Sequence, residues 1–168
     1  KIKPMVVVMP NGTIEGALMN EVPLFEKDMV TDIIPYVEAN YRVKTDKNSR
    51  AIAGLSMGGM ETMETALKHP ELFSYVWVLS AGYFPDRKEE FKKYSDLIQQ
   101  AAPGVKKNFK VLAFTQGGPT DIAYYNCKAT LKEFDKAGIK YEYNDVSGGH
   151  SWEAWRQNLY DLAPRLWK

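Results

Sequence analysis

The chain has 168 residues, of which 45% are hydrophobic and 26% charged, which is ordinary for a globular domain with a real core. Its formal net charge of +1 gives no electrostatic reason to expect nucleic acid or an acidic membrane surface as a partner. No apolar run approaches the roughly 18 residues of a membrane span. A single cysteine cannot form an internal disulfide, and two histidines without a Cys/His cluster argue against a metal site.

Short apolar runs alternate with helical patterns along the chain. The first run, Met5–Met9, is continuously apolar with three valines, which is typical of a strand buried on both faces of a parallel sheet. The patterns predict five strands, at residues 5–9, 50–55, 75–79, 110–114 and 140–146. They predict helices at residues 23–41, 61–68, 89–102, 123–137 and 152–167. This alternation favours one α/β domain over residues 1–168, with a mainly parallel sheet and helices on both faces.

Glycine and proline mark where several of these helices bend or end. Pro35 should kink or split the first helix, and Pro103 with Gly104 should end the helix that begins near residue 89. Gly138 is a suitable C-terminal stop for the following helix. In the last helix, one side carries the apolar residues Trp155, Leu159, Leu162 and Leu166.

A serine between glycines stands where the strand at 50–55 meets the next helix. The segment Gly54-Leu55-Ser56-Met57-Gly58 fits the pattern G-x-S-x-G in its required context of strand, sharp turn and helix. Small residues are needed around such a strained turn, and Gly54, Gly58 and Gly59 supply that room. The serine hydroxyl is then exposed beside a helix N-terminus, where the N–H of Met57 could stabilise an oxyanion.

A serine hydroxyl needs a base, and the base needs a carboxylate to orient it. In this architecture the three groups follow the chain order Ser, Asp/Glu, His. Asp121 ends a Gly-rich turn after the fourth predicted strand, and His150 follows Gly148-Gly149 after the fifth. Because the carboxyl ends of parallel strands share one edge of a sheet, Ser56, Asp121 and His150 should converge there.

Other readings of these residues stay open. Asp121 could simply cap the helix that begins near Ala123, and Asp135 and Asp145 compete with it as the orienting acid. His69 is expected to be a helix cap or surface residue, and Cys127 is expected to pack within a helix.

The three motifs around Ser56, Asp121 and His150, with Gly148-Gly149-His150-Ser151-Trp152 followed by Trp155, resemble the esterase D-like branch of the α/β-hydrolases. Within it, the chain is most similar to feruloyl and acetylxylan esterases of carbohydrate esterase family 1. The resemblance implies cofactor-free hydrolysis of ester decorations on plant cell-wall polysaccharides, in a secreted or periplasmic setting. It implies that Ser56 is the nucleophile, His150 the base, Asp121 its partner and Met57 an oxyanion donor.

The chain departs from the family at its N-terminus. In the family several strands precede the equivalent of Met5–Met9, and a loop after one of them supplies the second oxyanion donor. At about 30 residues per βαβ unit, roughly 60 to 100 residues are missing, so we expect an N-terminally truncated piece of an esterase. We expect the exposed strand edges to be covered by a homo-oligomer, a strand swap or a complementing N-terminal fragment, or the gap to close by pairing Val6–Val8 with Ala51–Ala53.

Three aromatic residues are candidates for a substrate wall: Trp152, Tyr83 and Phe84. They could stack on a feruloyl ring or a sugar, or belong to the core. Two alternatives to a polysaccharide esterase remain. The same triad could serve a thioesterase, a siderophore esterase or a peptidase, and the chain could be a non-catalytic remnant that binds carbohydrate or assembles with another subunit.

Overall fold

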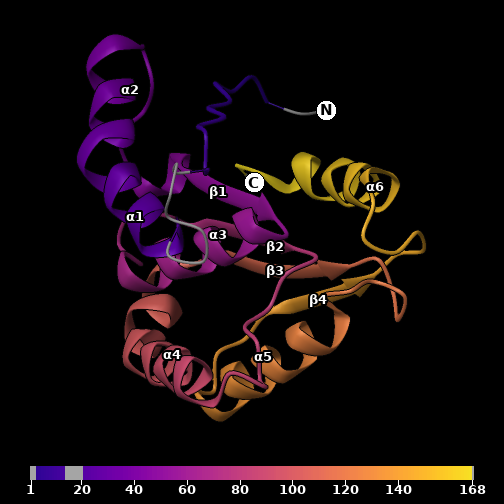
Figure 1. Ribbon diagram of the computed structural model, residues 1–168. Coiled ribbons are helices and arrows are strands. Elements are labelled where there is room, and N and C mark those ends of the chain that lie inside the picture. The colour runs from indigo at the N-terminus through magenta and orange to yellow at the C-terminus, as the bar shows by residue number, and fades with distance from the viewer. Residues whose placement is uncertain (1–2, 14–20, 168) are drawn as a thin grey trace.

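The computed structural model describes residues 3–13 and 21–167, and its centre is one parallel sheet (Figure 1). Four strands lie in the order β1 (Ala51–Leu55), β2 (Tyr75–Leu79), β3 (Val111–Gln116) and β4 (Glu142–Asp145). Each strand pairs in parallel with the next one along the chain, so all four carboxyl ends lie at one edge. The α/β class and the parallel sheet are therefore confirmed.

Helices follow every strand of this sheet. They are α3 (Met57–Lys68), α4 (Lys88–Asn108), α5 (Tyr124–Lys136) and α6 (Trp152–Leu162), the last continued by the 3₁₀ turn η4 (Ala163–Arg165). Ahead of the sheet come α1 (Glu21–Asp28), the π-helix η2 (Met29–Ile33), α2 (Ile34–Asn40) and the 3₁₀ turn η3 (Lys47–Ser49). No helix in the described ranges is long and apolar enough to cross a membrane.

The sheet is covered on both faces, as its sequence predicts. Successive side chains of a strand point to opposite faces. Tyr75, Trp77 and Leu79 of β2 therefore pack in the cluster that contains Trp155 and Leu162 of α6. The intervening Val76 and Val78 face the larger cluster formed with α3, α4 and α5. Figure 1 shows α6 on one side of the sheet, with α4 and α5 on the other.

The buried strand that the sequence predicts at the valine-rich segment Met5–Met9 is wrong. The segment is no strand in the structure, and its side chains are 37–88% exposed, Met9 most of all. Within the described residues β1 pairs with β2 alone, so Val6–Val8 do not pair with Ala51–Ala53. A run of β-branched apolar residues indicates that a segment is suited to a buried sheet. It forms a strand only where a neighbouring strand pairs with it.

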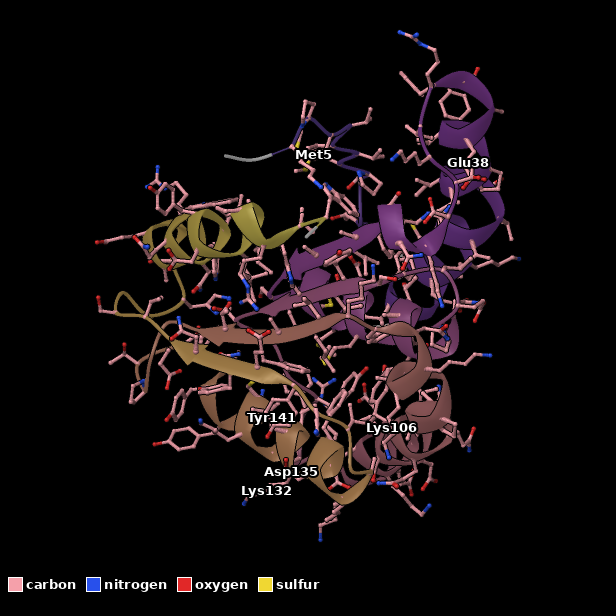
Figure 2. All side chains as sticks on the ribbon, turned by 180° about the vertical axis from the view of Figure 1, so that it is seen from behind. Met5, Glu38, Lys106, Lys132, Asp135 and Tyr141 are labelled. Carbon is pink, nitrogen blue, oxygen red and sulfur yellow. The ribbon has the colours of Figure 1, made fainter. Side chains whose placement is uncertain are left out.

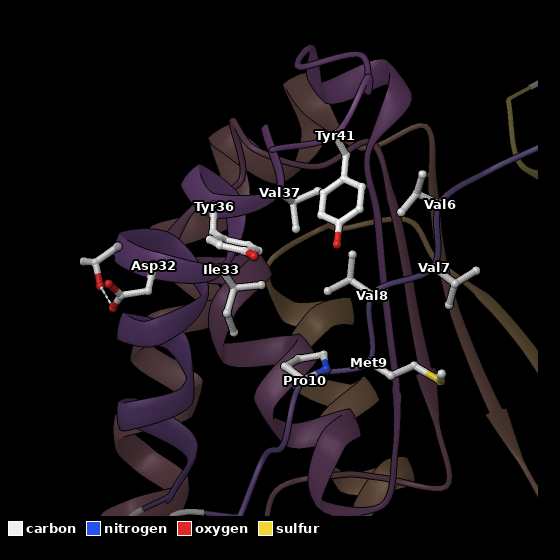
Figure 3. Close-up of a pocket in the computed structure, with 11 residues that line it drawn as sticks. Val6, Val7, Val8, Met9, Pro10, Asp32, Ile33, Tyr36, Val37 and Tyr41 are labelled. Carbon is white, nitrogen blue, oxygen red and sulfur yellow. Dashed lines mark hydrogen bonds between the residues drawn. The ribbon is translucent and has the colours of Figure 1, made fainter. Parts of the chain in front are cut away.

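An open groove of about 700 Å³ separates this segment from η2 and α2 (Figure 3). Val6–Pro10 form one wall, and Ile33, Tyr36, Val37 and Tyr41 contribute to the other. Figure 3 shows Val8 lying toward Tyr41 and Val37 across this space. The apolar character that predicted a buried strand is thus presented as an exposed surface.

Two prolines lie within helical segments that continue past them. The first predicted helix is not split by Pro35: α1, η2 and α2 run on from Glu21 to Asn40 without a break. Ahead of Pro35 the helix passes through a π turn, in which Ile34 donates its N–H to the carbonyl of Met29, and Pro35 lies in the first turn of α2. Pro103 and Gly104 likewise lie inside α4, which runs on to Asn108, so the predicted stop is wrong. Packing decides this: Val105 is buried in the core, and a Cβ on Gly104 would lie 2.6 Å from Pro70 Cγ.

The ends of α5 and α6 agree with the sequence more closely. Gly138 follows Ala137, the C-cap of α5, and has φ +62, the left-handed conformation of a helix stop. In the last helix Trp155, Leu162 and Leu166 are buried as expected, but Leu159 is 52% exposed. The predicted apolar stripe is therefore one residue wider than the buried one.

Candidate active site

Ser56 stands at the junction of β1 and α3 in a backbone conformation that side chains rarely adopt. Its φ is 54° and its ψ is −120°, and its N–H donates to the carbonyl of Leu79 on β2 at 2.9 Å. This bond ties the turn to the neighbouring strand. The strained turn is therefore held by the sheet, which is how a nucleophile elbow presents its hydroxyl.

The glycines around Ser56 are not equivalent. A Cβ on Gly54 would lie 2.0 Å from the carbonyl oxygen of Gly58, and one on Gly59 would lie 2.5 Å from Ala81 Cβ. A Cβ on Gly58 would meet nothing closer than Glu61 Oε2 at 3.8 Å. The expected need for small residues thus holds at Gly54 and Gly59, while Gly58 has space for a side chain.

His150 lies between the other two predicted catalytic residues. Its Nε2 is 2.9 Å from Ser56 Oγ, and its Nδ1 is 2.8 Å from Asp121 Oδ1. With Nδ1–H donating to the carboxylate, Nε2 is left as the acceptor for the serine proton. The structure therefore brings together the three residues that the sequence placed at strand ends.

Two loops interlock to hold Asp121 and His150 in this arrangement. The N–H of Gly149 donates to the carbonyl of Gly117 at 2.9 Å. A Cβ on Gly117 would lie only 1.8 Å from the carbonyl oxygen of Gly149. The loop after β3 and the loop after β4 therefore touch through backbone atoms, and glycine at 117 is what permits the approach.

Asp121 is 2% exposed and accepts hydrogen bonds on both carboxylate oxygens. Besides His150, the donors are the Ser80 hydroxyl at 2.5 Å and the backbone N–H groups of Gly117 at 3.0 Å and Ala123 at 2.9 Å. Burial acts to raise the pKa of Asp121, but hydrogen bonds from Ser80, Ala123, Gly117 and His150 together lower it below the ordinary value. The carboxylate is therefore kept ionised beside the imidazole.

The competing acids are occupied elsewhere. Asp135 accepts from the hydroxyl of Tyr141 at 3.0 Å on the outer side of α5 (Figure 2), and Asp145 accepts from Tyr143 at 2.5 Å. His69 pairs with Glu26 at 2.5 Å and caps the end of α3 opposite to Ser56, in keeping with its expected structural place. Cys127 is fully buried, and burial raises its pKa to about 12, so it is a packing residue.

Of the three aromatic residues predicted to form a substrate wall, Trp152 is exposed near His150, but Tyr83 is buried. Trp152 is 66% exposed and packs edge-on against Trp155, whose ring in turn packs edge-on against His150 with centroids 5.0 Å apart. Tyr83 instead lies in the core: it is 1% exposed and stacks on Tyr94 at 3.7 Å. Phe84 is partly buried against the core beneath the guanidinium of Arg87.

The prediction that Tyr83 belongs to the substrate wall is therefore wrong, because its side chain is buried and not open to a ligand. The loop after β2 turns inward, and the Tyr83 N–H donates to Thr130 Oγ1 on α5 at 2.8 Å. Sequence reasoning also passed over two exposed apolar residues beside Asp121, Ile122 and Tyr125, and over Ser80. Ser80 follows a buried strand directly, and that position at the common edge was the available signal.

The order Ser, Asp, His along a parallel α/β sheet, with the serine on a strand-to-helix elbow, makes this chain a member of the α/β-hydrolase class. More closely, it belongs to the esterase family whose model, described as "Putative esterase", matches residues 2–166.

A relative with a named activity agrees with this family. The chain is 34% identical over 176 residues to an endo-1,4-beta-xylanase/feruloyl esterase of Xylanibacter ruminicola; the match covers 100% of this chain and 22% of that protein. The resemblance to feruloyl esterases is thereby confirmed, while the chain spans less than a quarter of that relative.

Solved structures share the fold. A ferulic acid esterase superposes with a TM-score of 0.70 at 25% identity, covering 84% of this chain and 59% of that one. An S-formylglutathione hydrolase of Staphylococcus aureus superposes with a TM-score of 0.70 at 20% identity, covering 89% and 65%, which shows a common fold alone.

Proposed function

We propose that this chain hydrolyses carboxylic esters through an acyl-enzyme on Ser56. The observation that carries the proposal is the placement of His150, whose two ring nitrogens lie 2.9 Å from Ser56 Oγ and 2.8 Å from Asp121 Oδ1. Membership in the esterase family supports it. No cofactor is needed for this chemistry.

The geometry supports a two-step acyl transfer. Ser56 Oγ attacks the ester carbonyl while His150 Nε2 takes its proton, and the imidazolium is stabilised by the ionised Asp121. The first N–H of α3, that of Met57, has no helical residue ahead of it to bond, so it can donate to the oxyanion. His150 then protonates the leaving alkoxide, and water attacks the acyl-enzyme with the same base.

As substrate we propose ester decorations on plant cell-wall polysaccharide, with feruloyl or acetyl groups on xylan. The support is the Xylanibacter ruminicola relative, whose name joins a xylanase to a feruloyl esterase. The exposed indole of Trp152, two residues from His150, offers an aromatic face for a ring or a sugar. A secreted or periplasmic location follows from the same substrate.

A Ser56→Ala variant tests the reaction. It should abolish turnover of p-nitrophenyl acetate and methyl ferulate, and labelling by a fluorophosphonate, while its circular dichroism and melting temperature stay those of the parent. Ser147→Ala is a matched control, because Ser147 is an exposed serine in the His150 loop and should leave both readouts intact. Turnover by the Ser56→Ala protein would refute the mechanism.

A thioester substrate is the second candidate, favoured by the shared fold with an S-formylglutathione hydrolase. A panel of feruloyl, acetyl and thioester substrates separates the two. We expect kcat/KM to be highest for feruloyl or acetyl oxygen esters, and a preference for thioesters would transfer the assignment to the second class. A well-folded chain that no fluorophosphonate labels would instead be a non-catalytic remnant.

A further inference from the structure

Ser80 is a serine that the proposed mechanism does not use, although its position is unusual. It follows β2 directly, is fully buried, and has φ 47°. Its N–H donates to the carbonyl of Thr115 on β3 at 2.8 Å, so its backbone is fixed by the sheet. A left-handed conformation is unfavourable for any residue with a Cβ and is natural for glycine.

The Ser80 hydroxyl joins two buried polar groups. It lies 2.5 Å from Asp121 Oδ2 and 2.8 Å from Trp155 Nε1. An indole N–H can only donate, so the Ser80 oxygen is the acceptor of that bond. The single hydroxyl hydrogen is then left to point at the carboxylate. Trp155 thus determines which way Ser80 donates.

This pair acts on the oxygen of Asp121 that His150 does not touch. His150 and the N–H of Ala123 use Oδ1, whereas Ser80 and the N–H of Gly117 use Oδ2. Two bonds on each oxygen fix the rotation of the carboxylate about its own axis. Loss of Ser80 would leave Oδ2 with the N–H of Gly117 as its donor, in a place where Asp121 is only 2% exposed and water cannot readily substitute.

We propose that Ser80 and Trp155 are positioning residues for the Asp121 carboxylate, acting on the reaction through Asp121 and His150 without touching the substrate. The inference rests on the proposed esterase function. Trp155 contributes twice, since it orients the Ser80 hydroxyl and packs its ring edge-on with His150. The loop after β2 thereby joins the two loops that carry Asp121 and His150.

Two substitutions at Ser80 separate positioning from stability. Ser80→Ala removes the hydroxyl and keeps the unfavourable φ, while Ser80→Gly removes the hydroxyl and relieves it. We expect kcat for p-nitrophenyl acetate to fall about tenfold in both, the size that one hydrogen bond to a charged group provides, with KM changed less than twofold. The melting temperature of Ser80→Gly should be higher than that of Ser80→Ala.

A merely structural role gives a different pattern. In that case kcat would follow the melting temperature, and Ser80→Gly would keep more activity than Ser80→Ala. Full kcat in either variant, or a loss confined to KM, overturns the inference. The outcome is distinct from failure of the esterase proposal, because that failure would appear as activity surviving in Ser56→Ala.

A double variant tests whether Trp155 acts on Asp121 through Ser80. Trp155→Phe keeps an aromatic ring beside His150 and removes the N–H that Ser80 accepts. If Trp155 acts through Ser80, the kcat of Ser80→Ala/Trp155→Phe should lie within twofold of that of Ser80→Ala, so the two effects are not additive. If the loss in kcat of the double variant equals the product of the losses of the two single variants, Trp155 acts independently of Ser80, and its proposed action through Ser80 is refuted.

Discussion

His150 Nε2 lies 2.9 Å from Ser56 Oγ although 94 positions separate the two residues in the chain. Ser56 follows β1 and His150 follows β4, at opposite ends of the strand order, so three strand spacings or about 14 Å of sheet lie between their strands. The loop after β4 must therefore reach back across the edge. Gly148 and Gly149, with φ +120 and +66, turn it in that direction.

The unequal glycines around Ser56 lead to a first prediction. Gly58→Ala should fold, keep its activity and gain about 0.5 to 1 kcal/mol of stability, because alanine suits a helix better than glycine and its Cβ has space. Gly54→Ala is the matched contrast, since its Cβ would lie 2.0 Å from the backbone oxygen of Gly58. Melting temperature and p-nitrophenyl acetate turnover measure both.

We expect Gly54→Ala to lose most of its turnover and several degrees of melting temperature. The contrast fails if the two variants behave alike. Equal damage would mean that Gly58 also lies against the turn, and equal tolerance would mean that the backbone at residue 54 can move away from α3.

The sequence predicts the site better than it predicts the edge of the sheet. Ser56, Asp121 and His150 could be found because each requires only a strand end and a local motif, and parallel strands bring their ends together. Ser80 could not be assigned in the same way: its role depends on Trp155, which lies 75 positions away, and on the rotation of one hydroxyl.

The errors have a common cause in contacts between distant segments. Pro103 stays inside α4, where the following Val105 is buried. Tyr83 lies in the core because its backbone N–H is bonded to Thr130 of α5 and its ring stacks on Tyr94 of α4. Neither of these tertiary contacts can be predicted from the local sequence pattern. Met5–Met9 shows the converse case, in which a pattern typical of a buried strand has no paired strand beside it in the structure.

The charge of Asp121 gives a second prediction. Asp121→Asn should keep the fold but lower kcat on the order of 10⁴-fold, because an amide can hold Nδ1 in the wrong tautomer and cannot stabilise the imidazolium. The measurement is turnover of p-nitrophenyl acetate at neutral pH, with Asp135→Asn as the control. Asp135 bonds Tyr141 and should be dispensable for activity.

The same variant shows how Asp121 contributes to stability. Its pKa is lower in the folded state than the ordinary value of 3.8, so the unfolded chain binds its proton first as pH falls. The contribution is therefore complete above pH 3.8 and is lost as the pH falls through the folded-state pKa. The free energy of unfolding in urea should therefore fall more steeply over this pH interval for the parent than for Asp121→Asn. Parallel curves would show that the folded pKa is not lowered.

The exposed valine segment gives the third prediction. Val7 is 67% exposed and lies in the wall of the groove in Figure 3, so Val7→Lys should change the free energy of unfolding by less than about 0.5 kcal/mol. Val78→Lys is the contrast, because Val78 is fully buried in β2 and a lysine there should prevent folding. Chemical unfolding compares the two.

Self-association tests what the same surface does in solution. A contiguous apolar face such as Met5–Met9 with the opposite wall of the groove favours contact between copies. Sedimentation of the parent should therefore depend on concentration, and Val7→Lys should shift it toward the monomer because a charge at the contact must be desolvated. A strong loss of stability in Val7→Lys would show instead that residue 7 is buried as a strand in solution. Unchanged association at unchanged stability would place the contact between copies on another face.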